Sequence, residues 1–289
     1  MIYYEFTPID TLFFRGAIPL EAGLPVSETL FPPPVSVFAG AVRTASGPEF
    51  WNDPVEIPAV LLKKGPTYYA QAPYSWFVEK EKSGCGDVKK TIIPARDNSA
   101  EFEAAGILAS AWPLPWIDNT NAKSIGGSWI DVNLFTKGRD IQLQEESLFN
   151  TEDRVGVALG PHTRTAVEGR LYTTRHVRLR DGVNIVIALD NAVGLKEQGV
   201  LQLGGEGRRC AYQKIEGPHL NWNVKSDRYV ALASIPCTAE LLSKTFCAKT
   251  FVSAGWDLAK NYHKTSETWF YAGSVFNENI NNQCAPLAL

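Results

Sequence analysis

The residues best suited to bind an anion are arginines concentrated between Arg154 and Arg209. Between Arg154 and Arg180 there are six arginines and one acid, Glu168, a local net charge of +5 in a chain of formal net charge -3. A guanidinium is planar and donates two parallel hydrogen bonds to phosphate or carboxylate. The stretch therefore predicts either an anion-binding surface or a solvated β-ribbon whose charge serves solubility. Its eight arginines, out of 13 in the chain, are Arg154, Arg164, Arg170, Arg175, Arg178, Arg180, Arg208 and Arg209.

Histidines are the second group that could do chemistry, because an imidazole can act as a general acid or base. Acid–base catalysis without a metal could use His176 or His162, with Arg178 and Tyr172 nearby. Only one histidine, His176, falls on the arginine-bearing strand face, and no second acid–base group accompanies it. The sequence therefore favours a binding role over an acid–base enzyme, which stays as the alternative. No H-E-x-x-H, H-x-E or G-x-S-x-G motif is present, so we predict no catalytic residue, cofactor or metal site.

A glycine-rich loop follows, with the sequence Leu-Gly-Gly-Glu-Gly-Arg over residues 203–208. Glycines allow positive φ and let a ligand approach backbone N–H groups, which can form an anion-holding concavity. The Gly-Lys-Ser/Thr ending of a phosphate-binding P-loop is missing, and no strand-to-helix context for a dinucleotide fingerprint is expected. Without paired acids for Mg²⁺, a nucleotide-binding enzyme ranks below the acid–base enzyme. A tight loop before a strand explains the glycines equally well, and we expect Glu206 to orient Arg208 or another arginine.

Alternation of side chains predicts how the arginine stretch folds. Residues 171–180 are expected to form a strand with Thr174, His176, Arg178 and Arg180 on one face. The Arg-Asp-Gly sequence at 180–182 predicts a turn into a second strand at 183–189, so the two strands would form a hairpin. A short helix is expected at 193–198.

The rest of the chain predicts an α+β fold of two ferredoxin-like (RRM-like) domains, 1–150 and 151–289. In the first, proline residues at 32–34 and a possible cap at Ser36 introduce a helix, and its Gly40 suggests close packing on a sheet or close approach of a ligand. Residues from about 79 to 150 are expected to be an irregular insertion. Expected strands are 2–6, 57–62, 67–71, 210–215, 229–235, 246–252 and 268–275, and expected helices are 37–44 and 238–245.

Composition limits the class of protein. The chain is 45% hydrophobic and 20% charged over 289 residues, as in an ordinary globular protein with room for two domains. No signal peptide or membrane span is predicted. Five cysteines without C-x-x-C spacing predict free thiols in a reducing compartment, and hence a cytoplasmic protein.

Three motifs together resemble the third-subunit family of the type III-B (Cmr) CRISPR effector complex, a family of the RAMP superfamily. The first is Phe-Phe-Arg at 13–15 with Phe-Pro-Pro-Pro-Val-Ser at 31–36 and Ala-Gly-Ala-Val-Arg at 39–43. The second is Arg-Val-Gly-Val-Ala-Leu at 154–159 with Arg-Thr-Ala-Val-Glu-Gly-Arg-Leu-Tyr-Thr-Thr at 164–174, and the third is the glycine-rich loop. Each motif is modest alone, but the order and spacing are specific. The final residues 284–289 hold no glycine, unlike the glycine-rich closing strand of the family.

The resemblance implies two ferredoxin-like domains and a non-catalytic, RNA-binding subunit of an antiviral ribonucleoprotein. That subunit would hold the 5′ repeat-derived tag of the CRISPR RNA, dock the large polymerase/cyclase-like subunit, abut backbone RAMP subunits and meet target RNA only indirectly. The alternative that the resemblance leaves open is a metal-independent RAMP ribonuclease that processes precursor CRISPR RNA, with His176 or His162 as its acid or base. Tyr172 and Phe14 are candidates for base stacking, although a core role is favoured for both. Arg178→Ala is expected to lower the salt slope of RNA binding by about one unit. The candidate RNA contacts are Arg15, Ser36, Arg43, Arg164, Arg170, Thr174, His176, Arg178, Gly204, Gly205, Gly207 and Arg208.

Overall fold

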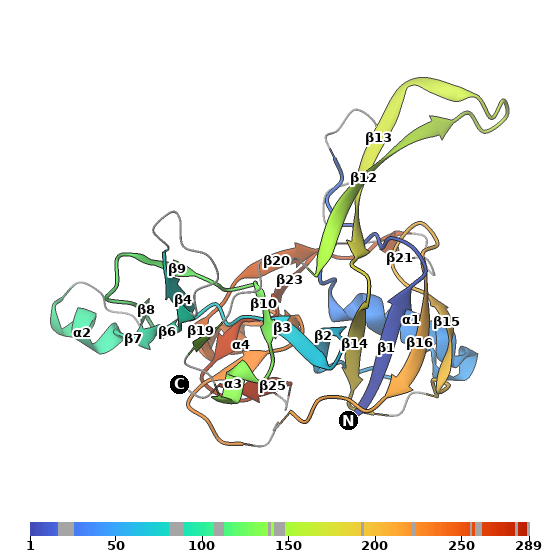
Figure 1. The fold of residues 1–289 in the computed structure, drawn as a ribbon. Helices are drawn as coiled ribbons and strands as arrows, with labels where there is room; N and C mark the ends of the chain where they lie inside the picture. The colour runs from blue at the N-terminus through green and yellow to red at the C-terminus, as the bar shows by residue number, and fades with distance from the viewer. Residues whose placement is uncertain are drawn as a thin grey trace.

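A central sheet, a projecting two-stranded arm and a second group of smaller sheets make up the molecule (Figure 1). In the computed structural model, the described residues are 1–16, 26–80, 90–106, 113–137, 140–141, 148–191, 194–220, 224–254, 256–257, 262–280 and 283–287. The predicted α+β class is confirmed, with most of the regular structure in strands.

Seven antiparallel strands form the central sheet in the order β10-β3-β2-β14-β1-β16-β15. The first strand of the chain, β1, lies between β14 and β16 and pairs with both. Alternate residues of β1 enter two separate cores, Phe6 on one face and Tyr3 on the other. The strands are β1 (Ile2–Pro8), β2 (Ala59–Lys64), β3 (Thr67–Gln71), β10 (Trp129–Asp131), β14 (Val183–Leu189), β15 (Gln198–Gln202) and β16 (Arg209–Ile215).

Helix α1 (Val35–Ser46) covers one face of this sheet. Its buried residues Phe38, Ala39 and Val42 pack in the same core as Phe6. The predicted cap is wrong: Pro34 occupies the N-cap position without a side-chain cap, and Ser36 is an exposed residue of the first turn. A Cβ at Gly40 would meet no atom within 4 Å, so Gly40 does not mark close packing within the chain.

A four-stranded antiparallel sheet from the end of the chain covers the opposite face, in the order β19-β24-β17-β25. Val230, Val275 and Ala285 pack there with Leu61 and Val186 of the central sheet. Beside it lie a three-stranded sheet, β18-β23-β20, and the ribbon β21-β22. The elements are β17 (Tyr229–Ala231), β18 (Ile235–Pro236), α4 (Ala239–Ser243), β19 (Thr245–Cys247), β20 (Thr250–Ser253), β21 (Trp256–Asp257), β22 (Tyr262–His263), β23 (Glu267–Phe270), β24 (Val275–Phe276) and β25 (Cys284–Pro286).

The expected irregular insertion contains short elements where it is described, and one of them, β10, joins the edge of the central sheet through β3. The others form two small sheets, β6-β4-β9 and β7-β8, and the ribbon β11-β5. These elements are η1 (Pro48–Phe50), which precedes the insertion, β4 (Trp76–Glu79), β5 (Lys90–Thr91), β6 (Ile93–Pro94), β7 (Arg96–Asp97), α2 (Ser99–Ala104), β8 (Pro115–Trp116), β9 (Ala122–Ser124), α3 (Leu134–Lys137) and β11 (Asp140–Ile141).

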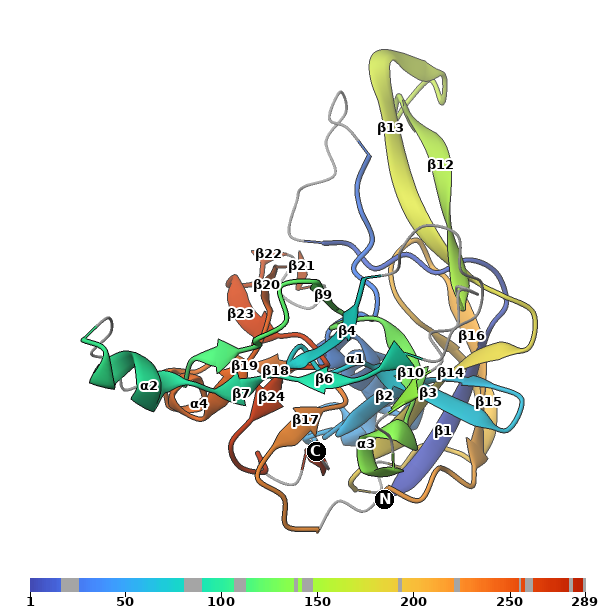
Figure 2. The same ribbon diagram turned by 60° about the vertical axis from the view of Figure 1, so that its left-hand side comes forward.

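The arm is the hairpin of β12 (Phe149–Leu159) and β13 (Ala166–Leu179), and it projects from the body in both views (Figures 1 and 2). The hairpin predicted from 171–180 and 183–189 is wrong. The turn at 180–182 exists, with Val183 N–H donating to the Arg180 carbonyl, but β13 pairs with β12 while β14 enters the central sheet. β12 is the better partner for β13 because ten residue pairs join the two strands in antiparallel register, and a separate turn at 160–165 connects them.

The predicted order strand, helix, strand, strand is found in β1, α1, β2 and β3, with a hairpin between β2 and β3. The central sheet takes strands from both sides of residue 150, so the expected boundary at 150/151 does not separate two sheets. Residue 193 lies outside the described residues, and 194–197 are not helical; a strand, β15, starts at Gln198.

Candidate functional site

The arm has a base, residues 149–154 and 174–179, and a tip, residues 155–173. At the base, side chains from three parts of the chain meet at the carboxylate of Asp10. Arg154 of β12 lies 3.2 Å from Asp10 Oδ2, and Arg178 of β13 lies 3.1 Å from Oδ1. Arg208 of the glycine-rich loop lies 2.7 Å from Oδ2. One carboxylate therefore joins both arm strands to the loop.

Two further acids complete this base cluster. Glu152 accepts hydrogen bonds from Nε of Arg154 at 3.0 Å and from Nε of Arg178 at 2.7 Å. Glu206 accepts from Nη2 of Arg208 at 3.1 Å, as the sequence predicted for this acid. Three carboxylates thus face three guanidiniums, and the cluster carries little net charge of its own. We define the base cluster as Asp10, Glu152, Arg154, His176, Arg178, Glu206 and Arg208.

His176 forms the buried floor of the cluster and is 0% exposed. Its Nδ1 lies 3.1 Å from the Thr11 hydroxyl, its Nε2 lies 3.0 Å from the Thr174 hydroxyl, and its ring stacks on Phe13 at 5.1 Å. Nε2 also lies 3.3 Å from Glu206. Burial lowers the pKa of His176, so the ring is neutral at pH 7 and bonded on both nitrogens.

Asp10 and Glu152 are held in their charged form. The backbone N–H of Thr11, followed by Arg154 and Arg178, holds the pKa of Asp10 below its ordinary value. Hydrogen bonds from Arg178 and Arg154 do the same to the pKa of Glu152. Ionised carboxylates at this point keep the three guanidiniums in fixed orientations.

The opposite face of β13 has its own ion pairs. Nε of Arg175 lies 2.7 Å from the carboxylate of Asp153 across the hairpin, and its Nη1 lies 2.6 Å from Glu28. The Arg175 hydrogen bond lowers the pKa of Asp153. Arginines of the arm base are therefore paired on both faces of the hairpin.

The glycine-rich loop connects strands β15 and β16, so a strand does lead into it. Gly204 adopts φ +82°, and a Cβ there would come within 2.5 Å of the Phe13 carbonyl oxygen. Gly205 N–H donates to that same carbonyl at 2.8 Å, and Gly207 adopts φ +66°. Gly204 and Gly205 let the backbone of the loop pack closely on residue 13. This agrees with the alternative given above, a tight loop before a strand. Because the Gly205 N–H is already bonded, it is not free to hold an anion.

The tip differs from the base. Arg164, at φ +53° in the turn, and Arg170 are exposed, and no described carboxylate pairs with either. Arg15, which belongs to the first motif and not to the arm, is also exposed, and no described acid pairs with it. One face of the tip is apolar and exposed, with Val155, Leu159 and Leu171 at 70%, 57% and 61%. The tip thus offers unpaired cations beside apolar side chains.

Other predicted residues lie apart from the base cluster. Arg43 and Ser36 are on α1, and Nε of Arg43 donates to the Asp53 carbonyl at 3.0 Å. Phe14 is buried in the core, as favoured. Tyr172 lies over Gly156, where any Cβ would overlap its ring, so one face of this candidate stacker is covered by the arm itself.

Sequence reasoning missed the acids Asp10, Glu152, Asp153 and Glu28. Two of these acids could have been found from the sequence, because Glu152 and Asp153 immediately precede Arg154. In the structure they lie opposite His176 and Arg175 in the register of the hairpin. Asp10 and Glu28 belong to a stretch without periodicity, and only the fold brings them to the arm.

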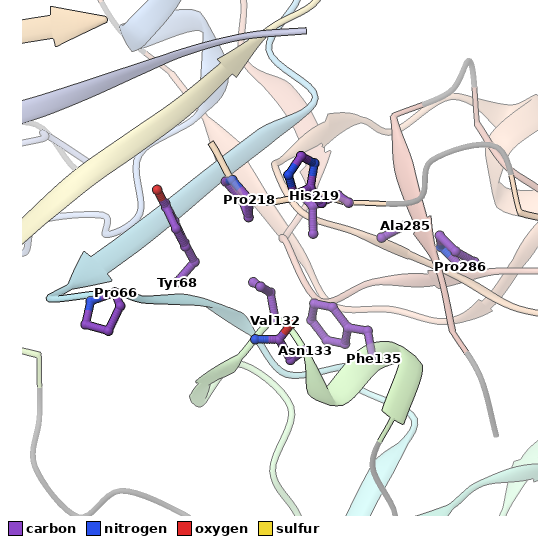
Figure 3. Close-up of a pocket in the computed structure, with 10 residues that line it drawn as sticks. Pro66, Tyr68, Val132, Asn133, Phe135, Pro218, His219, Ala285 and Pro286 are labelled. Atoms are coloured by element: carbon purple, nitrogen blue, oxygen red, sulfur yellow. The ribbon is translucent and has the colours of Figure 1, made fainter. Parts of the chain in front are cut away.

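A separate cavity of about 280 Å³ lies between the β2–β3 hairpin, α3 and the end of the chain (Figure 3). Pro66, Tyr68, Phe135 and His219 are among its lining residues, and none of the described residues that line it is a lysine, an arginine or a carboxylate. Among the described residues, no group of three or more His, Cys, Asp or Glu side chains is placed to hold a metal, and no helix could span a membrane. The four described cysteines are free thiols, as predicted; Cys85 lies outside the described residues.

Comparisons with known proteins agree with the resemblance drawn from the three motifs. Residues 128–229 match the family model described as CRISPR-associated protein (Cas_Cmr3). The chain is 28% identical over 144 residues to the CRISPR system CMR subunit Cmr3 of Saccharolobus solfataricus, and the match covers 46% of this chain and 46% of that relative. The chain thus matches less than half the length of this relative.

Solved structures extend the similarity of fold to nearly the whole chain. A chain of the type III-B Cmr-beta complex bound to cognate target RNA matches with a TM-score of 0.62 and 19% identity, over 96% of this chain and 86% of that one. A chain of the Csm3–Csm4 subcomplex of the type III-A interference complex matches with a TM-score of 0.51 and 12% identity, over 99% and 94%. These structures support the fold, while the family model and the curated relative support the predicted resemblance to the third subunit of the type III-B complex.

Proposed function

We propose that this Cmr3-type chain is the RNA-binding, non-catalytic subunit of a cytoplasmic type III-B CRISPR effector complex that holds the 5′ repeat-derived tag of the CRISPR RNA. It would dock the large polymerase/cyclase-like subunit, abut the backbone RAMP subunits and meet target RNA only indirectly. The whole-protein role comes from the resemblance, while the following observations support an RNA contact by this chain.

One observation carries the proposal: the arm tip presents Arg164 and Arg170, exposed and unpaired by any described acid, on a ribbon that projects from the body. Unpaired guanidiniums exchange condensed counterions for phosphates, which supplies most of the affinity of a sequence-independent contact. A projecting ribbon can follow a strand of RNA that the flat face of the sheet could not reach.

The remaining candidate contacts divide by their environment. Arg15 is exposed and available, whereas Arg178 and Arg208 reach RNA only on the sides that their carboxylate partners leave open. Thr174 and His176 are 2% and 0% exposed, so their support for RNA binding is indirect, through the shape of the arm base. Gly204, Gly205 and Gly207 shape the loop that carries Arg208.

The alternative function is a metal-independent RAMP ribonuclease. The observations on His176 disfavour its use as an acid or base, because both nitrogens are bonded and burial lowers its pKa. His162 is exposed in the arm turn, beside Thr163 and Arg164, and is the histidine that a nuclease would have available.

The apolar face of the tip suggests how protein partners take part. Val155, Val157 and Leu171 form an exposed apolar row on a narrow ribbon, which a soluble monomer rarely leaves uncovered. We propose that a neighbouring subunit or the RNA itself covers this row in the assembled complex.

The test is a binding and cleavage assay with 5′-labelled CRISPR RNA, with and without its repeat tag, with the protein alone and with the large subunit present. Tag-dependent binding of intact RNA, weakened by Arg164→Ala and Arg170→Ala, is the expected result. Arg96→Ala is the matched control, because it removes one exposed arginine that is paired with Asp118 in the small sheets. Tag-independent binding would contradict the proposal, and cleavage that survives EDTA and is lost in His162→Ala would favour the ribonuclease.

A further inference from the structure

Asp10 holds a position that its sequence context does not suggest. It lies two residues after the end of β1, and its two carboxylate oxygens accept hydrogen bonds from Arg154, Arg178 and Arg208 at 2.7–3.3 Å. These three arginines come from β12, β13 and the glycine-rich loop. No other described carboxylate contacts all three segments.

The segment around Asp10 also pairs with the free edge of β13. Leu12 and Val177 exchange both backbone hydrogen bonds at 2.8 Å, and Thr11 binds His176. Further along the same loop, Ser27 N–H donates to the Thr173 carbonyl and accepts from Arg175 N–H through its own carbonyl. The loop therefore contacts the arm base along its edge and on both faces, with Asp10 on one face and Glu28 on the other.

We propose that Asp10 is a positioning residue that fixes the angle of the arm over the glycine-rich loop. This proposal rests on the proposed function, because the angle matters only if the tip binds RNA. Without a shared carboxylate, three guanidiniums that converge on one point would repel each other, and the two arm strands would lose the link to the loop that runs through their arginines. With it, the unpaired arginines of the tip stand at a set distance from the loop, as a preorganised contact requires.

A charge argument and the positioning argument predict opposite results for one variant. Asp10→Asn removes one negative charge beside an RNA-binding surface, so electrostatics alone would tighten RNA binding. If Asp10 positions the arm, the same variant weakens binding of tag-containing RNA in spite of the lost negative charge. Glu168→Gln is the matched control, since it removes the same charge at the exposed tip, where no described residue pairs with Glu168.

The experiment measures hydrogen exchange of the RNA-free full chain and RNA affinity for the wild type, Asp10→Asn, Asp10→Glu and Glu168→Gln. In Asp10→Asn we expect exchange in residues 149–154 and 174–179 to rise by about tenfold, with β14 unchanged. Affinity for tag-containing RNA should fall in Asp10→Asn, recover in part in Asp10→Glu and rise in Glu168→Gln.

Unchanged exchange at the arm base would overturn the positioning role, whatever the RNA data show. Faster exchange in β14 as well would also overturn it, because Asp10 would then stabilise the whole sheet. If the wild type fails to bind RNA while the base still loosens, the positioning role stands and the proposed function fails. Should Asp10→Asn not fold, Arg178→Gln breaks the same link from the exposed side of β13 and must give the same local loosening.

Discussion

The base and the tip of the arm use the same residue type in opposite ways. At the base, Arg154, Arg175 and Arg178 each contact two carboxylates, and the hairpin is held against the body. At the tip, Arg164 and Arg170 have no described acidic partner, and the hairpin has no layer beneath it in either view. A count of arginines therefore overstates the number of phosphate contacts, because about half of those in the arm already have an anion.

The difference also separates stability from binding. Paired and buried side chains resist change because their removal leaves partners unsatisfied. Exposed and unpaired side chains cost almost nothing to remove from the fold, but each one removed is one cation fewer for RNA. Substitutions at the base should therefore act on folding, and substitutions at the tip should act on affinity.

The largest effect is expected from His176→Ala at the base. The variant leaves a cavity beside Phe13 and removes a hydrogen-bond partner from the hydroxyls of Thr11 and Thr174, which should lower the free energy of unfolding by about 2–4 kcal/mol. Denaturant unfolding measures this change. Leu171→Ala at the tip is the control and should change the free energy of unfolding by less than about 0.5 kcal/mol. Equal effects at the two sites would remove the distinction between base and tip.

The next effect concerns the salt dependence of RNA binding. The double variant Arg164→Ala/Arg170→Ala should lower the slope of log K against log salt by about 1.4, since each phosphate contact to a single strand contributes about 0.7. For Arg178→Ala the sequence predicted that this slope falls by about one unit. The structure predicts a smaller fall, because Glu152 and Asp10 already neutralise this guanidinium. Titrations of labelled RNA at several salt concentrations give both slopes. A larger change for Arg178→Ala than for the double variant would reverse the comparison.

How much of these two regions could be predicted depends on how far apart in the sequence the contacting residues are. Local patterns placed α1, the shared face of Thr174, His176 and Arg178, and five of the seven central-sheet strands correctly, because alternation is a property of one strand. They missed the arm strand β12 and the sheet strands β10 and β15. The partner of β13 was predicted wrongly, since a turn signal at 180–182 does not say whether the next strand pairs back or enters another sheet. The ion pairs to Asp10 and Glu28 are contacts over more than 140 residues, which no local pattern encodes.

A third prediction uses pH to examine the arm base alone. Burial lowers the pKa of His176 in the folded state, so the unfolded chain binds a proton more readily as pH falls below about 6.5. The free energy of unfolding should therefore be highest above that pH and decrease as pH falls toward the lowered pKa. The carboxylates Asp10 and Glu152, whose pKa values are also lowered, add a further loss only at more acidic pH.

The measurement is unfolding by denaturant between pH 5 and 8 for the wild type and His176→Gln. The difference between the two proteins should shrink as pH falls, because only the wild type loses the neutral-histidine contribution. The tip variant Arg164→Ala should follow the wild-type profile. A constant difference across this range would mean that His176 is protonated without cost in the folded protein.

The smallest effect is expected at Arg164, where stability and binding oppose each other within one residue. A non-glycine residue at φ +53° is strained, so Arg164→Gly should raise the free energy of unfolding by up to about 1 kcal/mol while weakening RNA binding. Arg164→Ala keeps the strain and removes the same charge, so the pair of variants separates the two contributions. Equal RNA affinity for both variants, with higher stability for glycine, would mean that the guanidinium is retained for binding at the expense of the turn. If glycine also restored affinity, the turn geometry rather than the charge would be what the RNA requires.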